Sequence, residues 1–240
     1  MAQHLVIVTG GSSGIGRALL EVCPWRDARR IDVSRRGGSA AEHHRADLAD
    51  PDAWPGVADL FERELAGFAG ERAVFFHNAG TLTPLGFSGE VDAAGYTRQV
   101  LLNSAAPQVL GDAFLRASAQ TRARCELVMI GSGAANNPYM GWSAYCAGKA
   151  AADHWVRTAG AEQERRGGRV RLLSVAPGVV ATPMQEEIRN TAERDFPDVA
   201  RFVALHEDGV LRDAAEVAQE LWALIDQDLA NGSVLDLRRD

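Results

Sequence analysis

The amino-acid sequence predicts one α/β domain over residues 1–240, a doubly wound parallel β-sheet flanked by helices on both faces. Three observations support this fold class. Short apolar runs alternate with amphipathic helical patterns along the chain. No linker, repeat or low-complexity tract interrupts the alternation, and 240 residues fit one large domain. The first apolar run leads through a glycine-rich turn into a helix, which is a typical opening unit of such a sheet.

The order of the elements follows from these patterns. Buried strands are expected where apolar runs are bounded by turn residues, at residues 5–9, 28–34, 43–48, 73–76, 126–130, 169–175 and 233–237. Helices are expected where apolar residues recur at helical spacing, at residues 15–22, 50–70, 97–115, 143–166, 184–193, 197–206 and 214–226. Because helical connections return the chain to the same edge of the sheet, the strands are expected to run parallel.

The first strand meets the segment Gly10-Gly11-Ser12-Ser13-Gly14-Ile15-Gly16, and a helix follows. Glycines allow positive φ and close approach by a pyrophosphate, while a helix N-terminus offers free N–H groups. A strand, a glycine-rich turn and a helix together predict a Rossmann-like cradle for the phosphates of a dinucleotide. The residues expected to hold the cofactor in this turn are Gly10, Ser12, Ser13, Gly14, Ile15 and Gly16.

The second strand ends at Ser34, Arg35 and Arg36, where such domains bind the adenosine ribose. An acidic group there binds the free 2′-hydroxyl of NAD, whereas a basic group accommodates the 2′-phosphate of NADP. These three residues favour NADP(H), although paired arginines also occur in solvated turns. Asp32 lies two residues earlier on the same side of the strand and leaves NAD open as an alternative.

Asp47 closes the third expected strand and has two possible roles. Its carboxylate is placed to accept a hydrogen bond from an adenine amino group, or it caps the helix that starts near Asp50 and Pro51. That helix is expected to end at Gly70, and the fourth strand then terminates in His77-Asn78-Ala79-Gly80.

Pro107 interrupts the helix expected at residues 97–115. A proline inside a helix removes the hydrogen bond to the carbonyl four residues earlier, which is that of Asn103. The freed carbonyl, together with the Asn103 side chain, is a candidate site for a bound water. The alternative is that Asn103 is an ordinary polar surface residue.

The segment after the fifth strand carries the candidate acid–base residues. Ser132 follows the strand at its carboxyl end, where open α/β sheets place their ligands. Tyr145 and Lys149 share one face of the next helix, and Lys149 is the only lysine among 25 basic residues. We expect the ammonium to lower the tyrosine pKa toward neutrality, which suits a general acid or base. Most tyrosine–lysine pairs at this spacing are nevertheless only surface pairs.

Composition argues against several classes of partner. The net charge of −7 and a pI near 5.4 argue against nucleic acid and anionic membranes. Three cysteines without a C-x-x-C pattern predict neither a disulfide framework nor a zinc site, and free thiols suit a reducing cytoplasm. No apolar run reaches the ~18 residues of a membrane span, and no leader precedes the first strand. We expect a cytoplasmic protein without a metal.

These motifs recur together in one known family. In chain order they are Thr9-Gly10, Gly14, Gly16, Asp47, Asn78-Ala79-Gly80, Asn103, Ser132, Tyr145, Lys149, Pro177-Gly178 and Thr182. With these motifs at matching spacing, the chain resembles the short-chain dehydrogenase/reductase family over essentially its whole length. The departure is His77, where most relatives carry Asn.

The resemblance implies a role for each site residue. Tyr145 would protonate the substrate oxygen as hydride arrives from the nicotinamide, with its pKa lowered by Lys149, which also binds the nicotinamide ribose. Ser132 would hydrogen-bond the substrate oxygen, and Asn103 would anchor a proton-relay water. The remaining cofactor contacts that it implies are Asp47, Leu48, Asn78, Ala79, Gly80, Pro177, Gly178, Val180 and Thr182.

A finer resemblance is to the benzil reductase and sepiapterin reductase branch of this family, carried by residues 131–142, 177–182 and 231–236. It implies NADPH as the cofactor and Asp236 as an anchor for the substrate. Tyr139, Met140, Trp142 and Met184 would then line an apolar pocket, with Ser132 and Tyr145 as its polar groups. The alternatives are core packing for Trp142 and Met140, and a protective edge-strand charge for Asp236.

The sequence therefore favours an NADPH-dependent carbonyl reductase whose substrate is a small molecule, either a bulky aromatic or a vicinal dicarbonyl compound. One alternative is an NAD-dependent alcohol dehydrogenase of the same family, which Asp32 supports. Another is a dinucleotide sensor without catalysis, which need not keep Ser132, Tyr145 and Lys149 together. By resemblance, the protein is expected to form a homodimer or a homotetramer.

Overall fold

The computed structural model describes residues 3–238, whose seven strands form one sheet. The strand order is β3-β2-β1-β4-β5-β6-β7, and each neighbouring pair is parallel. The strands are β1 (His4–Thr9), β2 (Arg29–Ser34), β3 (Glu42–Arg45), β4 (Arg72–His77), β5 (Arg124–Ile130), β6 (Val170–Ala176) and β7 (Ser233–Asp236). The predicted parallel sheet is confirmed.

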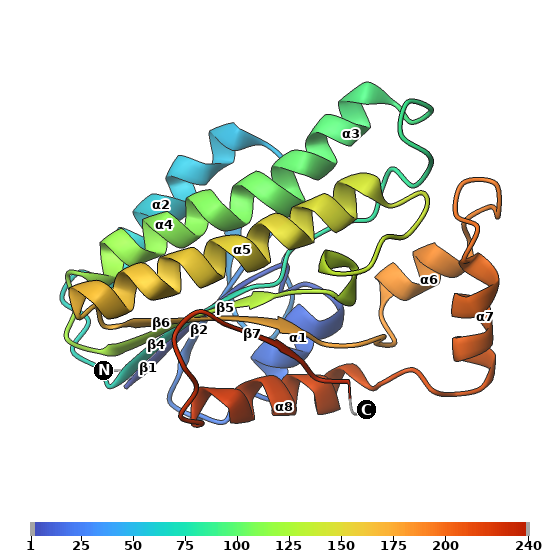
Figure 1. Cartoon of the computed structure of the whole chain (residues 1–240). Coiled ribbons are helices and arrows are strands. Elements are labelled where there is room, and N and C mark those ends of the chain that lie inside the picture. The colour runs from blue at the N-terminus through green and yellow to red at the C-terminus, as the bar shows by residue number, and fades with distance from the viewer. Residues whose placement is uncertain (1–2, 239–240) are drawn as a thin grey trace.

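Helices cover both faces of this sheet (Figure 1). One face carries α1 (Gly14–Glu21) and α8 (Ala214–Ile225), and the other carries α2 (Trp54–Leu65), α4 (Ala106–Ser118) and α5 (Ser143–Arg166). Side chains of β1 alternate between the two cores, with Leu5 and Ile7 on the second face and Val6 and Val8 on the first. The doubly wound arrangement is therefore confirmed. Within residues 3–238, no helix has the length and apolar character needed to cross a membrane.

The helix predicted over residues 97–115 is divided by a π-helix, η2 (Leu101–Ala105), which joins α3 (Ala93–Val100) to α4. Pro107 cannot donate the regular bond to the Asn103 carbonyl, and the chain takes a wider turn there. The wider turn places Asn103 inside the protein. The helical segment also begins earlier than predicted, because Asp92 caps it by accepting from the Gly95 N–H at 2.7 Å.

Two predicted boundaries in the first half of the chain are wrong. β3 stops at Arg45, and Asp47 lies in a turn in which its carboxylate accepts from the Ala49 N–H at 3.1 Å. Asp50 then caps a short 3-10 helix, Pro51–Ala53, which leads into α2. α2 ends at Leu65 rather than at residue 70, because Ala66 is extended and Gly67 has a φ of 73°.

The segment between β6 and α8 forms a small unit beside the carboxyl ends of the strands (Figure 1). It contains α6 (Pro183–Arg189) and α7 (Val199–Glu207), both shorter than the sequence predicts. Ile188, Phe196 and Phe202 pack there against Trp142 and Tyr145 in a third apolar cluster. This cluster attaches the unit to the start of α5.

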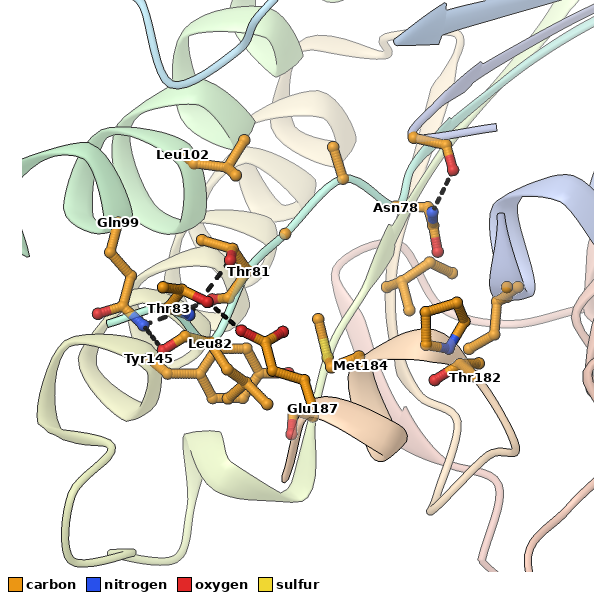
Figure 2. A pocket seen from close by; sticks show the side chains of 18 of the residues that line it. Asn78, Thr81, Leu82, Thr83, Gln99, Leu102, Tyr145, Thr182, Met184 and Glu187 are labelled. Carbon is orange, nitrogen blue, oxygen red and sulfur yellow. Dashed lines mark hydrogen bonds between the residues drawn. The ribbon is translucent and has the colours of Figure 1, made fainter. Parts of the chain in front are cut away.

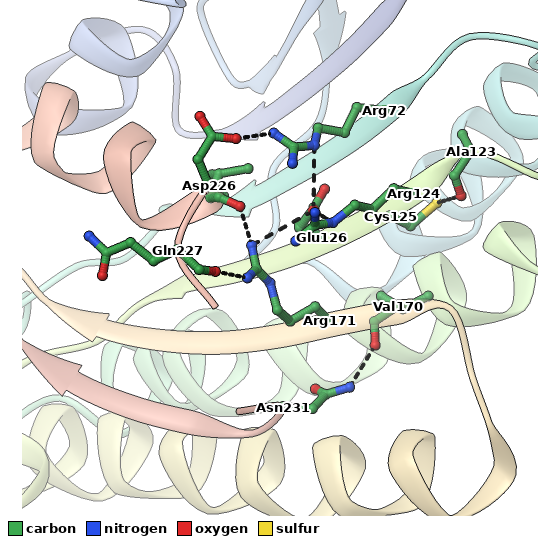
Figure 3. A network of polar contacts seen from close by, with 11 residues as sticks. Arg72, Ala123, Arg124, Cys125, Glu126, Val170, Arg171, Asp226, Gln227 and Asn231 are labelled. Carbon is green, nitrogen blue, oxygen red and sulfur yellow. Dashed lines mark hydrogen bonds and ion pairs between the residues drawn. The ribbon is translucent and has the colours of Figure 1, made fainter. Parts of the chain in front are cut away.

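A buried carboxylate lies at the opposite, amino end of the sheet (Figure 3). Glu126 in β5 is 0% exposed. The Arg124 Nε lies 2.7 Å from Glu126 Oε1, and nitrogen atoms of Arg72 and Arg171 lie at 3.7 and 3.8 Å from the same oxygen. Burial raises the pKa of Glu126, and the charges of the three arginines oppose that rise.

Candidate active site

A cavity of about 880 Å³ lies at the carboxyl ends of the strands and is lined by nearly all of the predicted site residues. Those that line it are Gly10, Ser12, Ser13, Gly14, Ile15, Ser34, Arg35, Arg36, Asp47, Leu48, Asn78, Ala79, Gly80, Ser132, Tyr139, Trp142, Tyr145, Lys149, Pro177, Gly178, Val180, Thr182 and Met184. The predicted residues outside its wall are Gly16, Asn103, Met140 and Asp236. Figure 2 shows Asn78 and Thr182 on one side of this cavity and Tyr145 with Gln99 on the other.

The glycine-rich turn has the shape of a phosphate cradle. Gly10 and Gly14 have φ values of 69° and 52°, which residues with a side chain rarely adopt. A Cβ on Gly16 would lie 2.3 Å from the Gly10 carbonyl oxygen, so Gly16 acts by keeping the turn closed rather than by facing the cavity. The N-cap residue Ser13 makes no side-chain cap bond to α1. The first N–H groups of α1 therefore lie beside the cavity without a capping side chain, which fits a pyrophosphate.

A clamp between β1 and β4 holds this turn in place. The Asn78 side chain donates to the carbonyl oxygens of Thr9 and Gly10, each at 3.2 Å. The buried Thr9 hydroxyl accepts from the N–H groups of Asn78 at 3.0 Å and Ala79 at 3.1 Å. Asn78 thus fixes the loop geometry while its neighbours line the cavity.

Asp32, the residue that left NAD open, is enclosed by its own chain. It is 1% exposed, and its two carboxylate oxygens accept from the Gly11 N–H at 2.8 Å and the Ser34 hydroxyl at 2.9 Å. Burial raises its pKa, against the hydrogen bonds from Ser34 and Gly11. Arg35 and Arg36 line the cavity, whereas Asp32 does not.

Asp47 makes an ion pair that the sequence did not reveal. Arg98 on α3 donates to the Asp47 carboxylate at 2.8 Å. Burial alone would raise the pKa of Asp47, but the hydrogen bonds from Arg98 and Ala49 and the charges of Arg98 and Arg35 lower it. The carboxylate is therefore held ionised at the edge of the cavity, and it caps its own turn rather than α2.

Tyr145 and Lys149 are both buried, at 7% and 8% exposure. Burial raises the pKa of Tyr145 to about 12, opposed by a hydrogen bond with Ser132. Burial lowers the pKa of Lys149 to about 8, opposed by the charge of Asp153. The expected net fall of the Tyr145 pKa toward neutrality is therefore not found, because burial raises this pKa. Lys149 Nζ donates to the Ile130 carbonyl at 2.7 Å and lies 5.7 Å from the centre of the phenol ring.

Desolvation explains why the phenol pKa rises. A buried phenolate loses its hydration, whereas the neutral phenol loses little. Tyr145 therefore carries its proton at neutral pH and is available as an acid.

The Asn103 side chain is committed to the backbone of Thr81. It donates to the Thr81 carbonyl at 2.7 Å and accepts from the Thr81 N–H at 3.0 Å. This pair of bonds fixes the loop after β4, and the water site expected at the Asn103 carbonyl and side chain stays a prediction. Gly148 on α5 permits the contact with η2, because a Cβ there would lie 2.8 Å from the Asn103 Cβ.

The substrate side of the cavity is mostly apolar. Trp142 stacks on Phe196 with ring centroids 4.4 Å apart, so it is both part of the third cluster and part of the cavity wall. Met140 is 57% exposed and does not line the cavity, so its predicted pocket role is wrong. On α6, Met184 and Glu187 both face the cavity, and the Thr83 hydroxyl donates to Glu187 (Figure 2).

Asp236 is turned toward its own chain. Its carboxylate oxygens accept from the Arg238 Nε at 3.0 and 2.9 Å, and this pairing lowers the pKa of Asp236. Arg238, not Asp236, lines the cavity. The predicted direct contact between Asp236 and a substrate therefore has no counterpart in the cavity wall.

Comparison with known proteins agrees with this geometry. Residues 4–193 match the family model described as short chain dehydrogenase. The chain belongs to the short-chain dehydrogenase family. It is 34% identical to a benzil reductase ((S)-benzoin forming) of Bacillus subtilis, over 98% of this chain and 99% of that protein. It is 32% identical to a sepiapterin reductase of Mus musculus, over 92% and 91% of the two chains.

The fold comparison gives the same family. A short chain dehydrogenase/reductase structure from Saccharomyces cerevisiae has a TM-score of 0.80 and 25% identity, and the match covers 98% of this chain and 96% of that one. As a short-chain dehydrogenase, the protein is an oxidoreductase, and the family binds a nicotinamide dinucleotide. The glycine cradle, the uncapped start of α1 and buried Lys149 fit such a cofactor.

Three residues that complete this short-chain dehydrogenase site were not found from the sequence. Arg98 and Arg238 are ordinary arginines by composition, and only the fold brings them to the cavity. Gly148 lies between Tyr145 and Lys149 on α5, and a glycine inside a long helix was a signal of close packing.

Proposed function

We propose that the protein is an NADPH-dependent carbonyl reductase that acts on bulky aromatic or vicinal dicarbonyl substrates. One observation carries the proposal: Tyr145, Ser132 and Lys149 meet at one wall of a cavity whose far end is the dinucleotide cradle. A bound nicotinamide cofactor would supply the hydride. The similarity to benzil and sepiapterin reductases supports the substrate class.

The chain's own residues handle the proton and the developing charge. Hydride addition to a ketone builds negative charge on its oxygen, and two O–H donors held in place stabilise that charge. Tyr145 gives its proton to the oxygen, and Ser132 donates a second hydrogen bond to it. Buried Lys149 places a positive charge behind the phenol, with its ammonium fixed by the Ile130 carbonyl.

The ribose end supports NADPH over NADH. Arg35 and Arg36 line the cavity and suit a 2′-phosphate. Asp32, the group that would accept from a free 2′-hydroxyl, is already engaged by Gly11 and Ser34. Fluorescence titration should therefore show a lower Kd for NADPH than for NADH. Arg35→Ala should reduce the ratio of these two Kd values by about tenfold. Tighter binding of NADH by the wild type would contradict this assignment.

The acid role is tested by Tyr145→Phe. We expect turnover of benzil to fall by about 10²–10⁴-fold, because the variant lacks the proton donor, while NADPH still binds. Tyr96→Phe is the matched control, since Tyr96 lies outside the cavity wall and should keep wild-type turnover. Near-normal turnover by Tyr145→Phe would overturn the acid assignment. Retained NADPH binding by a wild type without turnover on any ketone would instead favour a dinucleotide sensor.

We also propose a homodimer or homotetramer in the cytoplasm. Val100 on α3 and Val109 on α4 are exposed apolar residues, which supports self-association through the outer surface of these two helices. Cys23, Cys125 and Cys146 are free, which supports a reducing compartment. Sedimentation of the purified chain tests the first part, and a monomer at micromolar concentration would contradict it.

A further inference from the structure

The Arg238 side chain lines the cavity and packs against the backbone of two glycines, Gly178 and Gly133. A Cβ on Gly178 would lie 3.2 Å from the Arg238 Cγ, and a Cβ on Gly133 would lie 3.1 Å from the Arg238 Nη2. Gly133 directly follows Ser132, and Gly178 directly follows Pro177. The guanidinium therefore lies against the backbone next to the serine that holds the substrate oxygen.

Asp236 fixes the direction of this side chain. Its carboxylate accepts from the Arg238 backbone N–H at 2.9 Å, from the Arg238 Nε at 2.9 and 3.0 Å, and from the Arg238 Nη2. A carboxylate paired with a guanidinium in this way holds the planar group in one orientation. Arg238 is therefore a positioned cation in the cavity wall, and Asp236 is its positioning residue.

The remaining side chains near this wall define what the cation selects. Tyr139, Trp142 and Met184 give the substrate side its apolar surface, and the Glu187 carboxylate already accepts from Thr83. A guanidinium has only hydrogen-bond donors, so it favours a ligand group with acceptor oxygens. An acceptor oxygen close to the reacting carbonyl is a feature of 1,2-diketones, 2-oxo esters and 2-oxo acids, and simple ketones lack it.

We propose that Arg238, positioned by Asp236, binds the acceptor oxygen adjacent to the reacting carbonyl and so makes the site selective for vicinal dicarbonyl compounds. This inference rests on the proposed carbonyl reductase function and names the residue that sets its substrate class. The sequence predicted that an acceptor, the Asp236 carboxylate, contacts the substrate. The proposal instead assigns this contact to a hydrogen-bond donor, the Arg238 guanidinium.

The test compares two ketones with the same carbon skeleton. Benzil has the second oxygen, and deoxybenzoin has a methylene in its place. We measure kcat/KM for both with NADPH in the wild type and in Arg238→Met. The wild type prefers benzil partly because a diketone is the more reactive compound, so the readout is the change in the benzil-to-deoxybenzoin ratio on mutation. We expect that ratio to fall by about 10- to 100-fold, mainly through KM for benzil, because a charge-assisted hydrogen bond is lost.

Arg116→Met is the matched control, since Arg116 forms a comparable arginine–aspartate pair with Asp112 on the exposed side of α4. It should leave both rates and their ratio unchanged. Asp236→Asn is the second variant, which keeps Arg238 but loosens its orientation. We expect the ratio to fall in the same direction by a smaller factor, about threefold to tenfold.

The outcomes separate the two proposals. An unchanged ratio in an Arg238→Met enzyme that still reduces ketones would overturn the role of Arg238 and leave the reductase function standing. If Arg238→Met does not fold, an unchanged ratio in Asp236→Asn would overturn it. Failure of the wild type to reduce either ketone would overturn the proposed function itself, and the inference with it.

Discussion

The two ends of the sheet each bury a charge, and they treat it differently. At the amino end, Glu126 is surrounded by Arg72, Arg124 and Arg171 (Figure 3). At the carboxyl end, Lys149 makes a hydrogen bond to the Ile130 carbonyl, and the charge of one buried carboxylate, Asp153, acts on its ammonium without a direct ion pair between the two side chains among residues 3–238. Burial favours the neutral form of both groups, so it raises the pKa of Glu126 and lowers the pKa of Lys149.

The difference indicates what each end is for. A buried charge surrounded by opposite charges within its own chain is held by the fold, and removing one partner weakens the fold. A buried charge that its own chain compensates only in part costs stability, and it is expected where a ligand or a reacting group uses it. The amino end of this sheet is thus specialised for stability and the carboxyl end for chemistry.

Lys149→Met should give the largest effect on activity. We expect kcat/KM for benzil to fall by about 10²–10⁴-fold, because the charge that supports the acid is gone. The free energy of unfolding at pH 7 should equal or exceed that of the wild type, since a buried ammonium is removed. Lys149→Arg should also lose activity, because a guanidinium is wider than an ammonium and differently hydrated. An active Arg variant would contradict the need for a compact amine.

The pH dependence of stability gives the sign of the Lys149 contribution. Burial lowers the Lys149 pKa to about 8 from 10.5, so between these values the unfolded chain binds more protons than the folded one. The stability of the wild type relative to Lys149→Met should therefore rise between about pH 8 and pH 10.5. Urea unfolding at several pH values measures it, and a fall over this range would contradict the net cost of burying the Lys149 ammonium.

Arg124→Met should weaken the fold and spare the chemistry. The variant removes the closest nitrogen to the Glu126 carboxylate, and we expect a loss of about 2–3 kcal/mol at pH 7. Because burial raises the Glu126 pKa, acidification protonates the carboxylate and the loss should shrink as the pH falls below 7. Equilibrium unfolding at pH 7 and at a series of lower pH values measures this, with kcat/KM as the second readout. A large fall in kcat/KM without loss of stability would contradict the division between the two ends.

Gly148→Ala should disturb the carboxyl end without changing a charge. The added Cβ would lie 2.8 Å from the Asn103 Cβ, so α5 and η2 must move apart. We expect kcat/KM to fall by about tenfold or more, because Tyr145 and Lys149 move with α5 relative to the loop that Asn103 holds. Steady-state kinetics with benzil measures it.

Gly56→Ala is the control for that change, and its expected effect is the smallest. Gly56 lies in α2, and a Cβ there meets nothing within 4 Å. The alanine should stabilise the protein by about 0.5–1 kcal/mol and leave kcat/KM unchanged. Equal losses of activity in Gly56→Ala and Gly148→Ala would show that Gly148 has no special contact.

Much of the fold was predictable because its signals are local. Apolar runs alternating with helical patterns predict a parallel sheet, and the glycine-rich turn places the cofactor cradle after β1. The resemblance to a family then brought Ser132, Tyr145 and Lys149 to one site, and the structure places all three in one cavity wall.

The errors concern interactions between residues far apart in the chain. The pKa of Tyr145 depends on burial by the third cluster, which no spacing of Tyr145 and Lys149 reveals. Asp236 was expected to face the substrate, but its carboxylate accepts from Arg238, and Arg238 lines the cavity instead. Pro107 correctly marked a break in the helix, but the π turn that buries Asn103 depends on packing against Gly148.

The most direct test of the carboxyl-end site is the consumption of NADPH with benzil by the purified wild-type protein and by Tyr145→Phe. We expect steady turnover by the wild type, a loss of about 10²–10⁴-fold in the variant, and NADPH binding by both. NADPH binding without turnover of benzil, or of sepiapterin, a 2-oxo ester and a simple ketone tested beside it, would contradict the assignment of this cavity to carbonyl reduction.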